Sequence, residues 1–440
     1  MEAVEKKART KNPLGYQPIG RLLMKFAIPS VISMLVNAVY NIVDQIFIGQ
    51  GVGYLGNAAT TVATIILAVG TMLGAGGSAY AAIKLGEKKD DEAENTLGNV
   101  FILLVVIGIV LTVIGLVFLD PILTIFGATP KNMGYARDYA GIILIGTVFN
   151  LLGIGLSNMA RTDGSPNIAM MSMVTGALLN CVLDPVYIFV FHWGVKGAAI
   201  ATITSQIIAT IILVYYFMKK GNMRLRFDHM KPNGIIIKAA FSLGISSCIT
   251  QLSSTILQIV LNNSLVYYGD QTSVTGDVAL SAMGIVMKVS MIIISICIGI
   301  GIGAQPILGF NKGANQPKRI KKTYRIASNV ATGVTALGWA MFMLIPHIIL
   351  MLFGSADENF TNFAIKAMRI YDLGVFTAGF QITSTSYFQA TGQPMKASIL
   401  SSLRQLLLLI PLIIILPMSF GLDGILYAGP VADISSAIIV

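Results

Sequence analysis

Residues Asp163–Pro166 read DGSP, and residues Thr391–Pro394, 228 positions later, read TGQP. Three glycines recur at nearly the same spacing of 227 positions: Gly74 falls on Gly301, Gly76 on Gly303, and Gly197 on Gly424. This spacing is about half of the 440-residue chain. It therefore indicates two copies of one folded unit rather than a solenoid of short repeats.

The chain is strongly apolar, with 55% hydrophobic and 11% charged residues, whereas soluble domains average about 25% charged residues. We count twelve apolar segments, each long enough to cross a hydrocarbon core of ~30 Å. We therefore expect an all-α integral membrane protein with twelve transmembrane helices. The last span is short, and we expect it to continue beyond Val440. The expected spans are 25–48, 58–83, 97–119, 138–160, 168–191, 195–218, 236–266, 278–308, 326–346, 366–388, 397–419 and 424–440.

Basic residues predict the orientation of these spans. Of the 30 Lys and Arg residues, 24 lie before the first span or in alternate loops, and we count Lys396 and Arg404 among them. This bias predicts that both termini face the cytoplasm from a plasma membrane. The first twenty residues are polar and basic, so we expect no cleaved signal peptide. The net charge of +10 is thus mainly an orientation signal, and the sequence shows no basic soluble domain for nucleic acid.

The basic stretch 219–234, which contains Pro232 and Gly234, predicts where the two copies meet. We expect an N-terminal lobe over 1–218, a cytoplasmic linker over 219–234 and a C-terminal lobe over 235–440. Six spans in each copy would leave both copies in the same orientation. Their pseudo-twofold axis would then run along the membrane normal, with a cavity between the lobes.

Asp44 is an acidic residue late in the first expected span. Asn37, Tyr40 and Asn41 precede it by seven, four and three residues, which places the four side chains on one helical face. A carboxylate is costly to leave in lipid, so we expect Asp44 to face a cavity or a partner. The alternative is a hydrated carboxylate near the outer interface.

Asp184 is a second intramembrane acid, and Asn180 lies one helical turn before it. Pro185 cannot donate a hydrogen bond to the carbonyl of Cys181. A carboxylate, an amide oxygen and a freed carbonyl together could hold a sodium ion or a proton. The alternative is a proline kink with a hydrated acid. A sodium ion, if it binds, is expected at Asp44, Asn180 and Asp184.

Other polar side chains line up on single helical faces. On its own, each is more typical of hydrogen bonding between helices than of a ligand site. The seventh span carries an amide face without an acid, so we expect the acids of the site in the first lobe. The candidates for the cavity wall are Asn150, Thr202 and Gln206 in the first lobe, and Gln251 and Gln258 in the second.

Lys288 lies within the eighth span, beside Met287. It could neutralise an acid, touch a substrate, or extend to the interface. Met287 could line an adaptable binding site or simply pack. We expect Asp372 to be hydrated near the outer surface, and Asp433 to pair with Lys288 or with nothing.

The sequence offers no cofactor site. The three cysteines, Cys181, Cys248 and Cys297, lie in apolar spans without metal-ligand spacing. The histidines are scattered, and the glycine runs at 74–77 and 299–303 lack the following lysine of a phosphate loop. We therefore expect no cofactor, no direct use of ATP and no enzyme activity.

Four segments resemble signatures of the MATE (multidrug and toxic compound extrusion) family, in its MepA-like and DinF-like bacterial branch. They are VDQIFIG in the first span, RTDGSP at Arg161–Pro166, LNCVLDP at Leu179–Pro185, and YFQATGQP at Tyr387–Pro394. The resemblance covers essentially the whole chain. It implies a V-shaped pair of bundles with a central cavity, and export of organic cations and other drugs driven by inward flow of protons or sodium.

The resemblance also assigns residues. It maps the first-span carboxylate onto Asp44 and the fifth-span pair onto Asn180 and Asp184; Asn150 and Thr202 match with a less definite register. Some members of the family carry a seventh-span carboxylate where this chain has Gln251 or Gln258, which leaves coupling through the second lobe in doubt.

These observations predict an antiporter that works as a monomer by alternating access, with small cationic drugs and membrane lipid as its partners. Two other functions remain open. A lipid-linked precursor flippase of the same superfamily would want more spans or a cationic cavity, for which Lys288 is thin support. A prenyltransferase would need paired metal-binding carboxylates, and only the loop acids Asp90–Glu94 come near that pattern.

Overall fold

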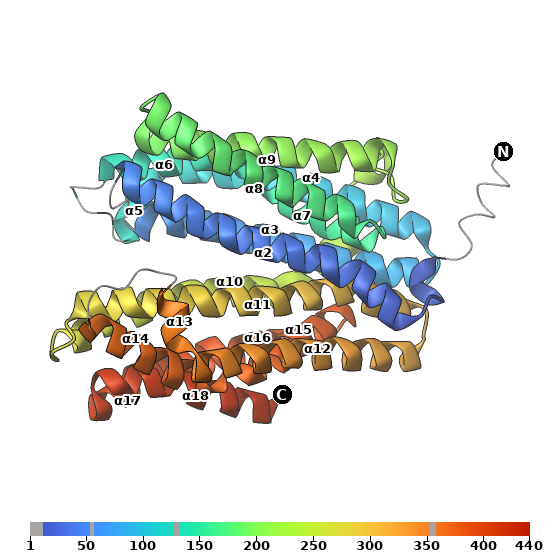
Figure 1. The fold of residues 1–440 in the computed structure, drawn as a ribbon. Helices are drawn as coiled ribbons and strands as arrows, with labels where there is room; N and C mark the ends of the chain where they lie inside the picture. Colours follow the sequence, from blue (N-terminus) through green and yellow to red (C-terminus); the bar gives the residue numbers. More distant parts are fainter. Residues whose placement is uncertain (1–11, 53–56, 127, 129, 131–132, 352–357) are drawn as a thin grey trace.

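The computed structural model of the chain describes residues 12–52, 57–126, 128, 130, 133–351 and 358–440. For 44–52 and 57–61 the helical backbone is described without the side chains. The described residues are almost entirely helical and include no strand, which confirms the expected all-α class. Figure 1 shows the helices in two groups that lie side by side.

The first half of the chain opens with a short 3-10 turn, η1 (Pro13–Gly15), and ends with another, η3 (Phe227–Met230). Between them lie α2 (Ile19–Val52), α3 (Asn57–Gly86), α4 (Asp90–Val117), α5 (Leu119–Ile125), α6 (Met133–Ile145), α7 (Thr147–Thr162), α8 (Pro166–Pro185), the π-helix η2 (Val186–Val190) and α9 (Gly194–Lys219).

The second half repeats this order with different interruptions. It contains α10 (Gly234–Gly269), α11 (Gly276–Gly313), α12 (Pro317–Leu344), α13 (Pro346–Met351), α14 (Glu358–Tyr371), the 3-10 helix η4 (Asp372–Thr377), α15 (Ala378–Ala390), α16 (Pro394–Ser402), the π-helix η5 (Leu403–Leu409), α17 (Ile410–Phe420) and α18 (Leu422–Ile439).

Ten helical segments among the described residues are long and apolar enough to cross a membrane. α6 and α7 would form an eleventh span, bent by 53°. α14, η4 and α15 follow one another without a gap and correspond to the tenth expected span. We expected the fourth and tenth spans to be continuous, and both are broken. At the bend of the fourth, a Cβ atom on Gly146 would lie 2.5 Å from the Ile203 side chain, so only glycine allows this approach of α9.

The backbone confirms the internal repeat. Left-handed φ values occur at Lys88 and Asn315 (62° and 53°) and at Gly164 and Gly392 (90° and 77°). They also occur at Gly194 and Gly421 (53° and 58°). The members of each pair stand 227 or 228 residues apart. Because side chains disfavour this region and glycine does not, the same tight turns at the same spacing mark two copies of one unit.

Each half has its own apolar core. One buried cluster draws mainly on α3, α4, α6, α7 and α9, and a second on α10, α11, α14 and α18. In lipid, every backbone N–H and C=O group must find its hydrogen-bond partner within the protein, and helices meet this requirement. The exact boundary of the lobes at 219–234 stays a prediction.

The two halves meet through glycines at one end. A Cβ on Gly76 would collide with the carbonyl of Ala240, and one on Gly244 with the carbonyl of Met72, so α3 and α10 touch backbone to backbone. A Cβ on Gly303 of α11 would lie 2.6 Å from Cα of Ala27 on α2. A third buried cluster joins the first turns of α2 to the last turns of α11. These contacts lie toward the end that carries the N-terminus and the linker, so the structure is closed at that end (Figure 1).

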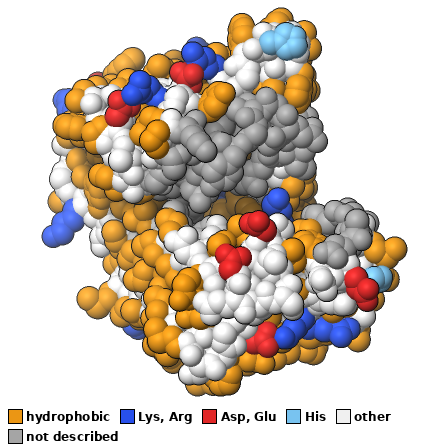
Figure 2. All heavy atoms as spheres, turned by 90° about the vertical axis from the view of Figure 1, so that its left-hand side faces the viewer, with side chains coloured by type: hydrophobic (Ala, Val, Ile, Leu, Met, Phe, Trp, Pro, Cys, Tyr) orange, Lys and Arg blue, Asp and Glu red, His pale blue; other side chains and the backbone are white. Residues whose placement is uncertain are grey.

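The opposite end carries ion-paired charges. Arg137 contacts Asp120 at 2.6 Å, Lys366 contacts Asp423 at 2.6 Å, and Lys196 contacts Asp138 at 3.5 Å. Figure 2 looks onto this end and shows acidic and basic side chains in small groups, with hydrophobic side chains around them. Basic residues are therefore balanced by acids here, whereas the other end carries most of the Lys and Arg.

Candidate functional site

Three of the predicted side chains lie together inside the first half. Asn180 and Asp184 are one turn apart on α8 and are 2% and 0% exposed; Thr202, on α9, is 7% exposed. The amide nitrogen of Asn180 donates to Asp184 Oδ1 and to Thr202 Oγ1, both at 3.3 Å. With the amide turned over, its nitrogen reaches Asp184 Oδ2 at 2.7 Å and its oxygen accepts from the Thr202 backbone N–H at 3.1 Å. The second arrangement is better, because it satisfies both ends of the amide.

Local sequence holds this cluster in place. Pro166 begins α8 at a position where its missing N–H costs nothing. Pro185 follows Asp184 directly and is succeeded by the π-helix Val186–Val190. A proline cannot complete the regular hydrogen-bond pattern, so the helix changes its pitch next to the buried acid. Bulges of this kind are frequent at functional sites.

Further oxygens in the first half are buried without a hydrogen-bond partner among the described residues. They are Asn150 Oδ1 and Thr147 Oγ1 on α7, and Ser205 Oγ on α9. α7 packs against both α8 and α9. A buried oxygen without a donor is costly, so these groups favour a bound cation or water nearby. Ser205 was missed in the sequence because a lone serine in a span usually bonds to its own helix.

The α2 part of the expected site is described only up to Val43. Asp44 lies on α2, which packs against α8, but its side chain is outside the described residues, so its role stays a proposal. Asn37 is exposed, while Tyr40 and Asn41 are half-buried. The amide nitrogen of Asn41 donates to the Asn37 carbonyl at 2.7 Å, which is an ordinary contact within the helix.

The expected amide face of the second half is partly accessible. Gln258 is exposed and donates to Asn262 Oδ1 at 2.8 Å, while Gln251 is half-buried. Gln206, Met287 and Lys288 are half-buried as well. Among the residues that the structure describes, Lys288 forms no ion pair within 4.0 Å.

Two acids in the second half are not where we expected them. Asp372 was predicted to be hydrated, yet it is 4% exposed and accepts a hydrogen bond from Ser290 Oγ at 2.8 Å. Asp433 was predicted to pair with Lys288 or with nothing. It is 2% exposed and instead contacts Arg404 Nε at 2.5 Å. Its backbone carbonyl accepts from Gln381 Nε2 at 2.9 Å.

The placement of Arg404 was also wrong. We counted it among the basic residues at the cytoplasmic end, but its side chain lies within the second lobe. Arg404 is ten residues after Pro394, which at 1.5 Å per residue is a depth of about 15 Å. This depth is the signal that could have identified it, because a basic residue so far into a span needs an acidic partner.

Among its described residues, the second half therefore contains two buried carboxylates, Asp372 and Asp433, and the half-buried guanidinium of Arg404. The Arg404–Asp433 pair balances one negative charge, and Asp372 has the Ser290 hydroxyl as its donor. An isolated buried carboxylate is costly, so Asp372 favours a bound proton or a second cation.

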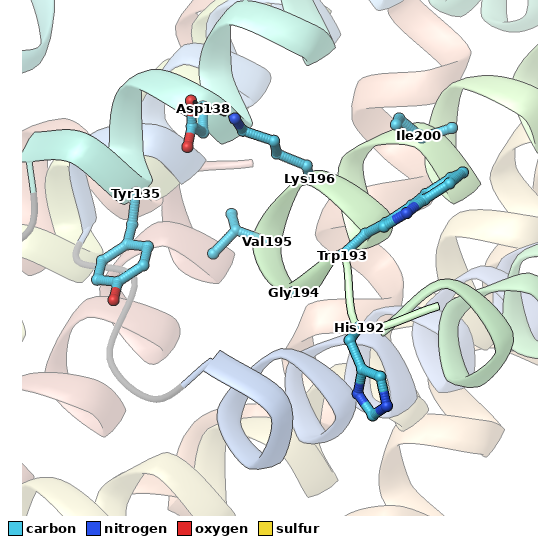
Figure 3. Close-up of a pocket in the computed structure, with 8 residues that line it drawn as sticks. All are labelled: Tyr135, Asp138, His192, Trp193, Gly194, Val195, Lys196 and Ile200. Carbon is cyan, nitrogen blue, oxygen red and sulfur yellow. Dashed lines mark ion pairs between the residues drawn. The ribbon is translucent and has the colours of Figure 1, made fainter. Parts of the chain in front are cut away.

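A separate cavity of about 670 Å³ lies at the ion-paired end of the molecule. Figure 3 shows Trp193 and His192 around its wall, with Lys196 directed toward Asp138. Tyr187, Phe191 and Trp193 form an aromatic group beside it, with ring centroids 5.2–5.8 Å apart. The described wall of this cavity includes no predicted site residue, so it is not the buried Asn180–Asp184–Thr202 cluster.

The part of the chain that the structure describes contains no group of three or more His, Cys, Asp or Glu side chains able to hold a metal ion. Asp184, Asn180 and Thr202 instead bring together carboxylate, amide and hydroxyl groups. Such oxygen donors suit a proton or a sodium ion, the usual coupling ions of secondary transporters.

Comparison with known proteins agrees with this architecture. The chain is 28% identical over 425 residues to "Multidrug export protein MepA" of Staphylococcus haemolyticus (strain JCSC1435), covering 94% of this chain and 91% of that protein. It is 25% identical to the protein of the same name from Staphylococcus aureus (strain MSSA476), with the same coverage.

Solved structures give the same result. The MATE multidrug transporter DinF-BH, solved as a complex, is 34% identical and matches with a TM-score of 0.86, over 95% of this chain and 94% of that one. A MATE family transporter in an outward-facing conformation, 24% identical, matches the fold with a TM-score of 0.88, over 98% and 95%. The MatE family model matches residues 29–186 and 243–415, one segment in each half, and the chain therefore belongs to the MatE family of membrane transporters.

Proposed function

We propose that this chain is a multidrug efflux transporter that exports organic cations in antiport with protons or sodium ions. The observation that carries the proposal is Asp184, which is fully buried in an apolar bundle and hydrogen-bonded to Asn180. The names of the MepA relatives and of the DinF-BH structure support drug export as the activity. A membrane acid of this kind is a functional group by default.

The coupling step in this proposal is neutralisation of Asp184. In its buried state the carboxylate favours a bound proton or sodium ion, with Asn180 and Thr202 as further oxygen donors. We also assign Asp44 to this site, because its helix α2 packs against α8. When the lobe opens to water, the ion is released because the carboxylate is hydrated again. The ion thus shifts the conformational equilibrium by its different affinity for the two states.

The second half supplies a further coupling group in this scheme. Among the described residues, Asp372 is buried without a basic side chain of its own, because Arg404 is held by Asp433. We assign Asp372 a second proton or cation. The sequence left coupling through this lobe in doubt, and the buried pair of acids favours it.

The drug path is proposed to lie between the halves. Its walls would carry Asn37, Tyr40 and Asn41 from α2, Asn150 and Gln206 from the first half, and Gln251, Gln258, Met287 and Lys288 from the second. We place both termini in the cytoplasm of a cell with the chain in its plasma membrane, acting as a monomer without ATP. The glycine contacts then close the cytoplasmic side, so the structure would be outward-facing.

The flippase alternative has less support. It would need a cationic cavity, whereas Lys288 is a single half-buried lysine and the amide face around Gln258 is neutral. No observation favours the prenyltransferase alternative.

Transport by the purified chain in proteoliposomes tests this proposal. A fluorescent organic cation is placed at equal concentration inside and outside, and a proton gradient or a sodium gradient is imposed in separate runs. We expect cation movement against its own gradient under at least one of the two. If neither gradient moves the cation, the chain is not a drug antiporter.

A further inference from the structure

Arg161 is a buried cation without a counter-charge among the described residues. It belongs to the last turn of α7 and is 3% exposed. Its Nη1 donates to Asn158 Oδ1 at 3.2 Å and its Nη2 contacts Met173 Sδ at 3.6 Å. Its Nε has no hydrogen-bond partner within the described part of the chain. No carboxylate there lies within 4.0 Å of the guanidinium.

Asp163, the acid that follows Arg161 by two residues, is occupied elsewhere. Its carboxylate accepts hydrogen bonds from the backbone N–H groups of Asn222 at 2.9 Å and Met223 at 2.6 Å, and from the Tyr216 hydroxyl at 2.5 Å. These contacts fasten the linker to the end of α7. Asp163 therefore does not neutralise Arg161.

A small cavity adjoins Arg161 where α3, α7 and α11 meet. It offers about 10 Å³ of space for the centre of a water-sized sphere. By this measure the cavity is close to the size that holds one water molecule. Ser78 and Asn158 contribute to its wall from the first half, and Ile302 and Gln305 from the second. The cavity is thus completed only when the two halves pack together at this end.

Three polar groups of this wall, on Asn158, Arg161 and Gln305, have donor hydrogens that are not used in hydrogen bonds among the described residues. The Asn158 amide nitrogen uses one hydrogen on the Ile154 carbonyl at 3.1 Å, and the Gln305 amide nitrogen uses one on Gln389 Oε1 at 3.0 Å. Each amide nitrogen carries a second hydrogen, and Arg161 Nε–H adds another donor. Donors and a buried positive charge together suit an anion.

We propose that this cavity binds a small monovalent anion, chloride in the cell, which neutralises Arg161 while the two halves are packed together. Chloride is somewhat larger than water, and the flexible side chains of Arg161 and Gln305 can move by a few tenths of an ångström to admit it. A carboxylate or phosphate ligand is too large for a space of this size. A water molecule would fit but would leave the charge uncompensated.

Chloride would then stabilise the closed end, because the site lacks Gln305 once the halves separate. A ligand of one state shifts the equilibrium toward that state. This effect is independent of which ion drives transport, and it requires no transport to be observed.

Anomalous diffraction from crystals of the unaltered protein grown with bromide tests the site directly. We expect a bromide peak within hydrogen-bonding distance of Arg161 and Gln305. Density for water only, or no halide peak at this position, would overturn the proposal.

Thermal melting in chloride and in gluconate, at equal ionic strength, provides the second measurement. We expect a higher melting temperature in chloride, approaching a limit as chloride is raised. A bromide peak without any chloride-dependent stability would mean an adventitious ion only, and would also overturn the proposal.

Asn158→Asp is the matched variant, because it replaces the amide that already accepts a hydrogen bond from Arg161 with a carboxylate. It should lose both the bromide peak and the chloride dependence. Arg137→Gln removes an exposed arginine at the opposite end and should keep both. A bromide peak that persists in Asn158→Asp would show that the anion does not serve to neutralise Arg161.

Discussion

At the scale of single residues, the surroundings of each charge decide its role. Asp120 directly follows an expected span and Asp184 lies inside one. Asp120 is exposed and paired with Arg137, whereas Asp184 is fully buried beside Asn180. Helical periodicity alone predicted that Asn180 and Asp184 share a face. It could not predict that Thr202, from another helix, completes the group.

The ion pair between the half-buried Arg404 and the buried Asp433 should respond differently to single and double substitution. Arg404→Met leaves Asp433 buried without its partner, which we expect to cost about 3–5 kcal/mol. The double variant Arg404→Met/Asp433→Leu removes both charges and should recover most of that loss. Thermal melting in detergent compares the three proteins. A double variant no more stable than Arg404→Met would contradict the pairing.

Asp163 should titrate above the usual range of an aspartate. Burial raises its pKa to about 6 from an ordinary value of 3.8, although hydrogen bonds from Tyr216 and the linker oppose the change. Between pH 3.8 and about 6, the folded protein therefore keeps a proton on Asp163 that the unfolded chain has already released. Its contribution to stability is complete below about pH 3.8 and is lost as the pH rises through about 6.

Infrared titration of the carboxyl band can measure this, with Asp163→Asn to assign the signal. We expect a midpoint near pH 6 that disappears in the variant. A carboxyl signal of Asp163 that titrates at the ordinary value for an aspartate would show that the side chain is hydrated and that the linker is not fastened there.

At the scale of helices, the sequence predicted the number and order of the spans but not their interruptions. The segment around Pro185 could be recognised as irregular because proline blocks a helical hydrogen bond. Pro411, two residues after the π-helix Leu403–Leu409, cannot donate to the carbonyl of Leu407, and this signal was missed. The 3-10 helix that begins at Asp372 contains no proline. Arg404 and Asp372 lie in these two interrupted segments, and Asp372 is buried.

Glycine contacts between α3 and α10 should control closure of the end that carries the linker. A Cβ on Gly244 would collide with the Met72 carbonyl, so Gly244→Ala should separate the two helices there. Gly284→Ala, on α11, is the control, because nothing among the described residues lies within 4 Å of its added Cβ. It should be neutral or slightly stabilising, since alanine favours a helix by about 1 kcal/mol.

Hydrogen–deuterium exchange can compare these variants. We expect faster exchange over residues 236–250 in Gly244→Ala and an unchanged rate in Gly284→Ala. Equal protection of this segment in both variants would mean that the halves do not depend on the close backbone contact.

At the scale of the whole molecule, the two halves share one architecture but bury different polar side chains. The shared turns at Gly164 and Gly392 preserve the architecture, which is why spacing in the sequence was enough to predict it. The first copy places a buried acid, Asp184, beside an amide and a hydroxyl. The second places two buried acids near the half-buried Arg404. This difference depends on contacts between helices, which the sequence of a single helix does not reveal.

The central claim is that the buried Asp184 cluster couples an ion to drug export. Drug flux from proteoliposomes under an imposed ion gradient should be compared between Asp184→Asn and Asp120→Asn, a control at an exposed acid. We predict that Asp184→Asn folds normally and loses gradient-driven flux at least tenfold, an effect of about 1.4 kcal/mol on the rate-limiting barrier, while Asp120→Asn retains it. Full gradient-driven flux in Asp184→Asn would contradict the account.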